Sequence, residues 1–390
     1  MYRIFLVFVL VFIITTSCSV KTQNDQVLAD NWQLGPFNKV DDYNPCLIPD
    51  KTLTFQCPVR KQEVKWEEKD VFNPAVVVKD EKIQLLYRAE DVIGKFNGTS
   101  RLGLATSENG LEFNKLPKPV FFPDNDFMKD LEWEGGVEDP RIVESDDGKY
   151  ILTYTAYNGD LARLCVASST DLKNWEKHGL AFGKAENGNY KELWCKAGAI
   201  VCRQEGEKLI AAKINGKYWM YWGESNVYAA TSDNLIDWYP VVNQDWRYKD
   251  FAEKNSEKKD FIVAGKKYLV PVFSTRKKRF DSELVEPGPP ALITDKGILL
   301  IYNSKNSPEF GDKNLADGTY AAGQVLMDIE NPLSVIARCT ESFFKPDKPY
   351  EITGQVNNVC FVEGLAFFKD SWYLYYGTAD SKIGVAKFTP

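Results

Sequence analysis

The sequence predicts an all-β fold, a five-bladed β-propeller, from three observations: a recurring hairpin, a recurring turn and the spacing of that turn. The hairpin has an apolar strand, a polar turn with Asp, Gly or Lys, and a second strand rich in aromatic and β-branched residues. No long amphipathic helix stands out. Six copies are legible, at Val76–Ala89, Ile142–Ala156, Ile200–Ile214, Phe261–Phe273, Leu292–Ser304 and Leu365–Gly377.

The recurring turn reads Ser-x-(Asn/Asp)-x-x-x-aromatic and occurs at Ser107–Phe113, Ser169–Trp175 and Ser232–Trp238. Its copies begin 62 and 63 residues apart. A period of this length, built of short strands, favours a propeller with one four-stranded sheet per repeat, and the chain suits about five repeats. We expect the last hairpin to pair with N-terminal residues and close the ring. A β-sandwich or a β-solenoid is the alternative fold.

The N-terminus predicts an exported lipoprotein. Arg3 precedes an apolar run, Ile4–Ile14, that is too short to span a bilayer, so residues 1–17 are predicted to be a signal peptide. Small residues before Cys18 resemble a bacterial lipoprotein cleavage site, at which Cys18 becomes lipidated. Residues 18–31 are then a lipidated terminus with a polar tether, and residues 32–390 are one propeller domain. The alternative is an ordinary signal peptide with an incidental cysteine.

The composition excludes several classes of function. The net charge of −7 and the lack of a basic stripe argue against a nucleic-acid partner. His178 is the one histidine, which excludes multi-histidine metal centres and leaves general acid–base chemistry to carboxylates, lysine or tyrosine. No CxxC occurs, so we expect neither a metal site nor a cofactor.

Six of the seven cysteines other than Cys18 fall into two groups. Cys46 and Cys57 could form a disulfide in an exported protein. The others that lie in apolar runs are predicted to be buried thiols: Cys165, Cys195, Cys202 and Cys360.

Four acidic motifs carry the candidate chemistry. The string Gly135–Arg141 (GGVEDPR) places Asp139 before a proline, and we expect a stiff turn at the start of a strand that presents this carboxyl to a ligand. Glu224 follows an aromatic strand, Glu286 precedes a Pro-Gly-Pro-Pro run, and Asp380 ends the last aromatic strand. Acids on separate sheets can serve glycosidic chemistry, in which one protonates the leaving oxygen and another activates water. The alternative for each single acid is a solvated turn residue.

Several strings together resemble a known family: Val71–Ala75, Leu85–Ala89, Gly135–Arg141, Lys213–Tyr218, Pro287–Pro290, Asn331–Arg338 and Tyr375–Asp380. From about Asn73 to Ala386 the chain resembles glycoside hydrolase family 130, five-bladed propellers that act on β-mannosides. The resemblance implies that Asp139 is the catalytic acid, which protonates the glycosidic oxygen through the C3 hydroxyl of the bound mannose.

The same resemblance implies a subsite for the non-reducing mannose, lined by Asn73, Arg88 and Asp380. Arg88 could instead be a structural ion-pair partner. We also expect substrate contacts from Ser100, Arg141, Lys213 and Asn303.

Departures from the family pattern favour hydrolysis over phosphorolysis. Phosphorylases of the family bind phosphate with a basic cluster that includes a histidine, where this chain has Asn303, while Lys213 is retained. Additional carboxylates would repel phosphate. The chain thus resembles the hydrolytic branch, exo-acting β-1,2-mannosidases, with Glu224 and Glu286 as the base and its partner in an order that the sequence leaves open. The alternatives are a β-mannoside phosphorylase that makes mannose 1-phosphate and a glycan-binding surface lipoprotein without catalysis. The expected partners are a mannose-containing oligosaccharide and, through the lipid alone, a membrane.

Overall fold

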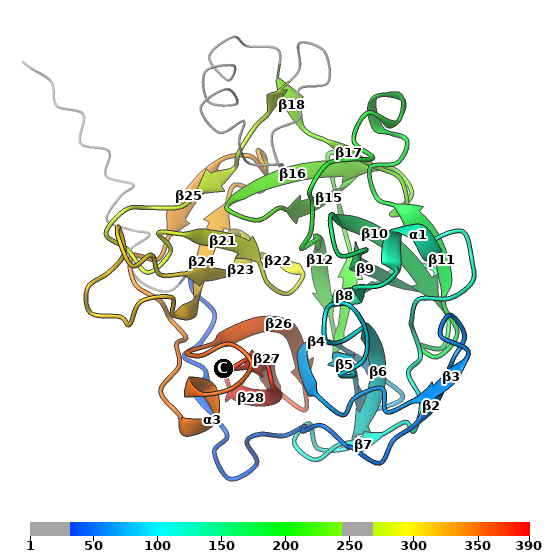
Figure 1. Ribbon diagram of the computed structural model, residues 1–390. Helices are drawn as coiled ribbons and strands as arrows, with labels where there is room; N and C mark the ends of the chain where they lie inside the picture. The colour runs from blue at the N-terminus through cyan, green and yellow to red at the C-terminus, as the bar shows by residue number, and fades with distance from the viewer. Residues whose placement is uncertain (1–31, 244–267) are drawn as a thin grey trace, which may run out of the picture. The chain divides into compact units, whose positions relative to one another are not determined.

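The computed structural model describes residues 32–243 and 268–390, and the unit Gln33–Pro390 is nearly all β (Figure 1). The predicted signal peptide and tether lie outside the described residues, as does most of the hairpin predicted at Phe261–Phe273. Short helical turns sit in loops: α1 (Lys129–Glu132), a 3-10 turn (Ala185–Gly188) and α3 (Pro349–Ile352). No helix in the described part of the chain is long and apolar enough to cross a membrane.

Within the described ranges, most strands fall into five consecutive groups of mainly antiparallel neighbours, which we call sheets, and pairings such as that of β12 (Ala199–Glu205) with β22 (Ala291–Thr294) connect some of these groups. The first has β4 (Asp70–Lys79), β5 (Lys82–Glu90), β6 (Ser100–Ser107) and β7 (Asn114–Lys115). The second has β8 (Gly136–Glu144), β9 (Tyr150–Tyr157), β10 (Ala162–Ser169) and β11 (Glu176–Leu180). The third has β12 (Ala199–Glu205), β13 (Lys208–Ala211), β14 (Lys213–Ile214), β15 (Lys217–Trp222), β16 (Asn226–Ser232) and β17 (Trp238–Pro240).

The fourth sheet has β21 (Leu284–Pro287), β22 (Ala291–Thr294), β23 (Gly297–Lys305), β24 (Tyr320–Met327) and β25 (Val335–Arg338). The fifth has β26 (Cys360–Phe368), β27 (Ser371–Thr378), β28 (Lys382–Phe388) and β1 (Asn38–Lys39). Short additional strands are β2 (Phe55–Cys57), β3 (Gln62–Val64), β18 (Val242–Asn243), β19 (Tyr268–Leu269) and β20 (Phe273–Ser274). The five predicted hairpins that fall in the described ranges are confirmed.

The predicted recurring turn is confirmed and has the same hydrogen bonds each time. The serine Oγ accepts a hydrogen bond from the backbone N–H three residues later, from Gly110 to Ser107, from Leu172 to Ser169 and from Leu235 to Ser232, at 2.8–3.0 Å. This local side-chain cap is what makes the repeat visible in the sequence.

The first strands of the sheets meet near one centre. β4 contacts both β8 and β26, and β12 pairs in parallel with β22. In Figure 1, β4, β8, β12, β22 and β26 lie nearest to the middle of the unit. β1 joins the sheet of the last hairpin, with Asn38 opposite Lys387 on β28, so the predicted pairing of the last hairpin with N-terminal residues is confirmed. Residues far apart in sequence can therefore share a site at the centre.

The cysteines are free thiols in the described residues, and the disulfide predicted between Cys46 and Cys57 is wrong. The two pack against different sheets: the Cys46 N–H donates to Ile383 on the fifth, whereas the Cys57 thiol lies beside the Arg101 guanidinium of the first. The predicted buried thiols are buried: Cys165, Cys195, Cys202 and Cys360.

Candidate active site

Asp139 is presented by a β-bulge inside β8 rather than by the turn expected at the start of a strand. Between Glu138 and Arg141, two residues of β8 oppose one residue of β9, and Asp139 has φ = 48°. A bulge re-aims the side chains around it, and Pro140 fits because a bulge needs no ladder donor there. The carboxyl of Asp139 is 2% exposed. The bulge therefore holds a buried acid at the centre of the unit.

Two other inner strands carry a bulge at a polar residue. Asn73 is the additional residue between Phe72 and Pro74 in β4, and Glu363 is the additional residue between Val362 and Gly364 in β26. Asn73 Nδ2 donates a 2.9 Å hydrogen bond to Asp139 Oδ1. Bulges thus break the alternation of side chains where polar groups must face the centre.

Arg88 on β5 holds the acids of the first two sheets together. Its Nη1 donates to Asp139 Oδ1 at 2.9 Å, and its Nη2 donates to Glu138 at 2.9 Å and to Glu90 at 2.8 Å. Its Nε donates to Ser100 Oγ at 3.0 Å. Arg88 is thus an ion-pair partner of the site's own carboxylates, with Ser100 beside it, and its contact with mannose stays a prediction.

Lys196 is the cation at the middle of the site, and sequence reasoning missed it. Its Nζ lies 3.6 Å from Asp139 Oδ2 and 3.7 Å from Glu286 Oε1. Lys213, the predicted basic residue, is exposed on β14, where its ammonium group lies 4.9 Å from the centroid of the Tyr218 ring. The structure does not bring Lys213 to the other predicted site residues. The isolated lysine in the string Trp194–Gly198 was the available signal.

Glu286 belongs to the fourth sheet, and Glu224 follows a strand of the third. Glu286 on β21 is 1% exposed, and its Oε1 has no hydrogen-bond partner among the described residues. Glu224, in the loop after β15, accepts a 2.9 Å hydrogen bond from Trp194 Nε1. The structure therefore brings both predicted glutamates to Lys196, whose pKa they raise against the opposing effect of burial.

Arg141 and Asn303 are buried next to this cluster, and their side chains bind backbone groups and, for Arg141, the carboxyl of Glu363. The Arg141 guanidinium donates to three backbone carbonyls and pairs with Glu363, and the Asn303 amide binds the backbone of Val362. Both were expected to contact substrate, but their polar groups are already engaged. Their contact with substrate stays a prediction.

The carboxyls of the cluster differ in their affinity for protons. For Asp139, burial favours the neutral form, but the charges of Arg88, Lys196 and Arg141 outweigh it and hold the pKa well below its usual range. Burial raises the pKa of Glu138 to about 7, with Arg88 opposing and Asp139 adding to the effect. Two carboxylates that share one guanidinium thus divide into one ionised group and one that binds a proton.

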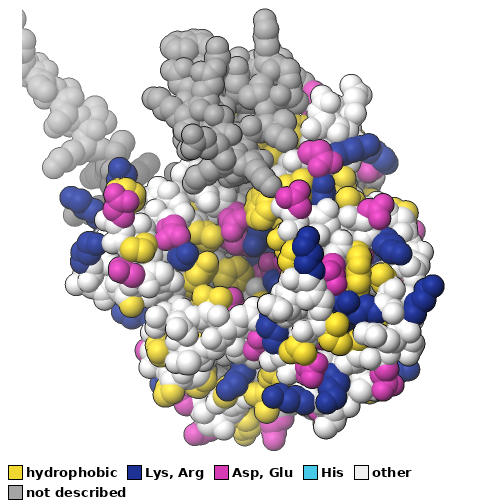
Figure 2. All heavy atoms as spheres, in the orientation of Figure 1, with side chains coloured by type: hydrophobic (Ala, Val, Ile, Leu, Met, Phe, Trp, Pro, Cys, Tyr) yellow, Lys and Arg dark blue, Asp and Glu magenta, His cyan; other side chains and the backbone are white. Residues whose placement is uncertain are grey.

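Burial likewise raises the pKa of Glu286 to about 7, with Lys196 opposing it and Glu224 adding to it. Asp380 follows β27 with φ = 49°, and burial raises its pKa to about 7, with Arg88 opposing. Groups with a pKa near 7 in a central cluster suit acid–base catalysis at neutral pH. Figure 2 shows a hollow near the centre of this face, where acidic and basic side chains lie beside hydrophobic ones.

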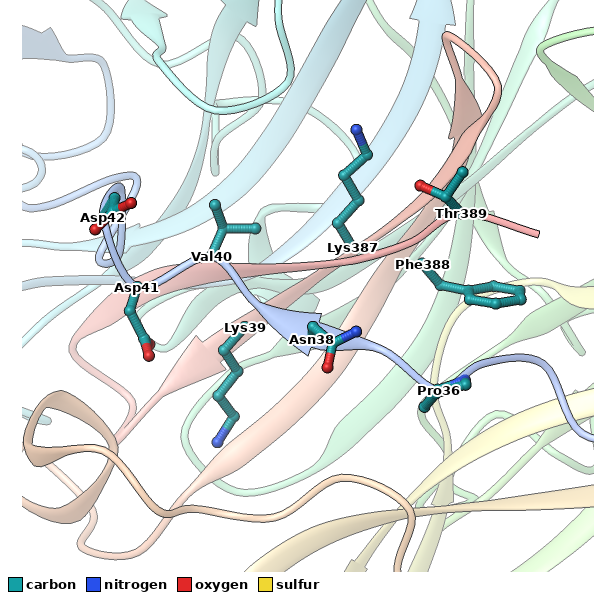
Figure 3. A pocket seen from close by; sticks show the side chains of 9 residues that line it. All are labelled: Pro36, Asn38, Lys39, Val40, Asp41, Asp42, Lys387, Phe388 and Thr389. Carbon is teal, nitrogen blue, oxygen red and sulfur yellow. The ribbon is translucent and has the colours of Figure 1, made fainter.

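A pocket of about 710 Å³ lies elsewhere, along β1 and β28 (Figure 3). Its nine lining residues, which include Lys39, Asp41 and Lys387, contain none of the predicted site residues. The central cluster, and not this pocket, is the candidate active site.

Comparisons with known proteins identify the family of this chain. The family model for glycoside hydrolase family 130, described as β-1,4-mannooligosaccharide phosphorylase, matches residues 51–389. A 1,2-β-oligomannan phosphorylase of Thermoanaerobacter sp. (strain X514) is 33% identical over 84% of this chain and 92% of its own.

Two solved structures are more similar in sequence. A glycosyl hydrolase from Bacteroides ovatus is 46% identical, with a TM-score of 0.85 over 93% of this chain and 95% of its own. A second, from work on GH130 glycoside hydrolases that target β-1,2-mannosidic linkages in Candida mannan, is 45% identical, with a TM-score of 0.85 over 93% and 96% of the two chains. The chain therefore belongs to glycoside hydrolase family 130, a family of enzymes that act on β-mannosidic linkages.

Proposed function

We propose that this protein is an exo-acting, inverting glycoside hydrolase that releases mannose from β-1,2-linked mannosides. The observation that carries the proposal is the shared contact of Asp139 and Glu286 with Lys196. The two contacts limit the separation of Asp139 Oδ2 and Glu286 Oε1 to at most about 7.3 Å. An inverting hydrolase needs its two carboxyls about 6.5–9.5 Å apart, so this upper limit is compatible with a water molecule between base and sugar.

The scaffold that we propose is a five-bladed propeller, with one described sheet per blade. The five consecutive sheets, the contacts of β4 with β8 and β26, and the parallel pairing of β12 with β22 support this assignment. The site then lies where the innermost strands converge.

In the mechanism that we propose, Asp139 is the general acid and Glu286 is the base. Glu286 takes a proton from water, which attacks the anomeric carbon from the face opposite to the leaving group. The proton for the glycosidic oxygen leaves Asp139 and passes through the C3 hydroxyl of mannose. Because Asp139 is ionised in the free site, its proton must come from a neighbour, and Glu138, which shares Arg88 with it, holds one up to about pH 7.

Glu224 is the partner of the base. Trp194 fixes one of its oxygens, and its negative charge helps to raise the pKa of Glu286, which makes Glu286 a stronger base. This orders the two glutamates that the sequence left open.

Phosphorolysis is the second candidate. It is favoured by Lys196 and by the names of the 33% identical relative and of other matched proteins, which are phosphorylases. Against it, Lys196 is already surrounded by Asp139, Glu286, Glu224 and Glu138. The Asn303 amide is 0% exposed, and both its nitrogen and its oxygen bind the Val362 backbone, so it is poorly placed to bind phosphate. A phosphate with about two negative charges would enter a site with an excess of carboxylates. A purely glycan-binding role is less well supported, because binding alone does not require a buried carboxyl oxygen without a partner.

We further propose that the enzyme is a lipoprotein held in a bacterial envelope through Cys18. The signal-like segment and the small residues before this cysteine support the proposal. A sugar phosphate made outside the cytoplasm would be hard to recover, so export also favours hydrolysis.

The deciding experiment is incubation with β-1,2-mannobiose in buffers with and without phosphate, with the first-formed product observed by NMR. We expect free α-mannose at a rate that does not depend on phosphate. The matched substrate control is β-1,4-mannobiose, which should react more slowly. Mannose 1-phosphate as the main product would replace this proposal by phosphorolysis, and binding without any turnover would favour the glycan-binding role.

A further inference from the structure

Arg141 connects the strand of the acid with the strand of the base. Its Nη1 donates to the backbone carbonyl of Asp139 at 3.0 Å. Its Nη2 and Nε donate to the carbonyls of Pro287 at 2.7 Å and Gly288 at 2.9 Å, the two residues after Glu286. One rigid guanidinium thus spans β8 and β21, and its orientation affects both carboxyls at once.

Glu363 is the ionisable partner that orients this guanidinium. Its Oε1 lies 2.9 Å from Arg141 Nη2, closer than Glu286 Oε1 at 3.7 Å. The side chain is 0% exposed, and neither of its carboxyl oxygens has a hydrogen-bond partner among the described residues, so its contact with Arg141 is an ion pair. A buried carboxyl with so little compensation is costly, so its position on the inward bulge of β26 calls for a role.

Asn303 holds the bulge that carries Glu363. Its Nδ2 donates to the Val362 carbonyl at 2.9 Å, and its Oδ1 accepts from the Val362 N–H at 2.7 Å. The backbones are also in close contact here, because a Cβ at Gly288 would lie 2.8 Å from the Val362 carbonyl oxygen. Asn303 lies opposite Glu286 in the β21–β23 ladder. The two hydrogen bonds between Asn303 and Val362 therefore connect the strands beside Glu286 with β26.

We propose that Asn303 and Glu363 are positioning residues that hold Arg141 against the backbone at Asp139 and Pro287, and so fix the separation of the acid and the base. The chain of contacts runs from Asn303 through Val362 and Glu363 to Arg141. Neither residue needs to touch the sugar. This inference rests on the proposed roles of Asp139 and Glu286, whereas the contacts of Arg141 with the backbone beside each of them are observed directly.

The first test separates the effect of side-chain length at Glu363 from the effect of its charge. Glu363→Gln keeps the length of the side chain and an oxygen that can accept from Arg141 Nη2, whereas Glu363→Asp keeps the carboxyl but is one methylene shorter. If reach matters, Glu363→Asp lowers kcat by about 10²-fold with KM little changed, because misplacement by about 1 Å can cost that much. Glu363→Gln should lose far less.

Glu132 provides the matched control. It is also buried, and its partners, Lys177 and Tyr154, lie outside the cluster. Glu132→Asp and Glu132→Gln should lower the thermal midpoint without the selective loss of kcat. A Glu363→Asp enzyme that is at least as active as Glu363→Gln, or that loses kcat only in proportion to its folded fraction, would overturn the proposal.

The second test is a double-mutant cycle between Asn303 and Glu363. Asn303→Asp keeps the acceptor for the Val362 N–H but places a second acceptor against the Val362 carbonyl, so the bulge should shift and kcat should fall. Combined with Glu363→Asp, it should lower kcat little further, because both changes release the same guanidinium. Additive effects on kcat would contradict the proposed chain of contacts.

Both tests compare each variant with the wild-type enzyme on the product that the wild-type enzyme forms. If that product is mannose 1-phosphate, the proposed hydrolysis fails while the positioning of Arg141 is still tested. If the product is mannose but Glu363→Asp behaves like wild type, the positioning fails and hydrolysis stands.

Discussion

Lys196 Nζ lies 3.7 Å from Glu286 Oε1, an oxygen that has no hydrogen-bond partner among the described residues. Arg141 Nη2 lies equally far from this oxygen, at 3.7 Å, and a buried carboxyl that two cations approach without a hydrogen bond keeps a high affinity for protons. The same ammonium group also faces Asp139 at 3.6 Å, so one cation acts on both carboxyls of the proposed reaction.

The first prediction concerns the acid. Asp139→Asn keeps the shape of the side chain but removes the carboxylate that receives the proton and passes it on, so kcat should fall by about 10²–10⁴-fold or more. The measurement is mannose release from β-1,2-mannobiose under saturating substrate. Asp171→Asn is a suitable control, because Asp171 caps a distant turn and pairs locally with Asn174. Near-native kcat in Asp139→Asn would contradict the assignment.

The second prediction orders the two glutamates. Glu286→Gln should nearly abolish turnover, because it removes the base itself. Glu224→Gln should leave measurable activity with a lower apparent pKa on the acidic side, because the negative charge that raises the pKa of Glu286 is gone. Rate profiles against pH distinguish the two variants. If Glu224→Gln is inactive and Glu286→Gln retains activity, the roles must be exchanged.

The third prediction is a bell-shaped pH profile with both limbs near pH 7. Activity should rise as Glu286, with a pKa of about 7, loses its proton and becomes a base. It should fall again as Glu138, also with a pKa of about 7, loses the proton that supplies Asp139. Measuring kcat/KM from pH 4 to pH 10 reports these groups in the free enzyme. Glu138→Gln should remove the alkaline limb, and an unaltered limb in that variant would refute the proton supply.

The raised pKa values also predict how stability depends on pH. A carboxyl whose pKa is higher in the folded than in the unfolded state stabilises the fold at low pH, and this contribution is lost as pH rises through the folded value. Between about pH 4.5 and pH 7, wild-type protein should therefore lose the stabilisation that Glu286 provides. Thermal midpoints of Glu286→Gln should fall less over this range. Parallel curves for the two proteins would show that Glu286 does not titrate there.

Much of the fold and part of the site could be predicted from the sequence, for identifiable reasons. The hairpins and the serine-capped turns are local, so their residues specify them. Asp139 and Asp380 were singled out by their acidic strings, and Asn73 and Arg88 were predicted from the resemblance of their strings to the family.

The missed residues depend on tertiary geometry. Glu363 is a single acid in the apolar strand Cys360–Phe368, and only the bulge turns it toward Arg141. Lys196 lies in the loop before β12, and the packing of this loop orients its side chain. Lys213 stands in a more recognisable string, but its hairpin lies at the exposed edge of β15. The pattern of residues in a strand shows which of them alternate, but not where an additional residue reverses the alternation.

The anchor gives a separate prediction. Cys18→Ala should move the protein from the membrane fraction to the soluble fraction, because a lipidated Cys18 is the proposed attachment. Activity per folded molecule should not change, since residues 1–31 precede the unit that carries the site. Fractionation of cells that express each form, followed by immunoblotting, checks this. An unaltered membrane fraction would mean that another part of the chain or another protein holds it there.

The last prediction concerns the central cation. Lys196→Met keeps most of the apolar stem and removes the charge that lowers the pKa of both Asp139 and Glu286. The acidic limb of the pH profile should therefore move upward by about one pH unit or more, because an opposite charge within about 4–6 Å shifts a carboxyl by that amount. Lys213→Met is the matched control, because its ammonium group is exposed beside Tyr218, and its profile should coincide with that of the wild type. Lys196→Met with an unchanged profile would show that the ammonium group does not act on the base. If Lys196→Met loses turnover and added phosphate lowers turnover in the wild type, Lys196 is instead a phosphate ligand. Phosphate and the proposed water would then compete for the same position.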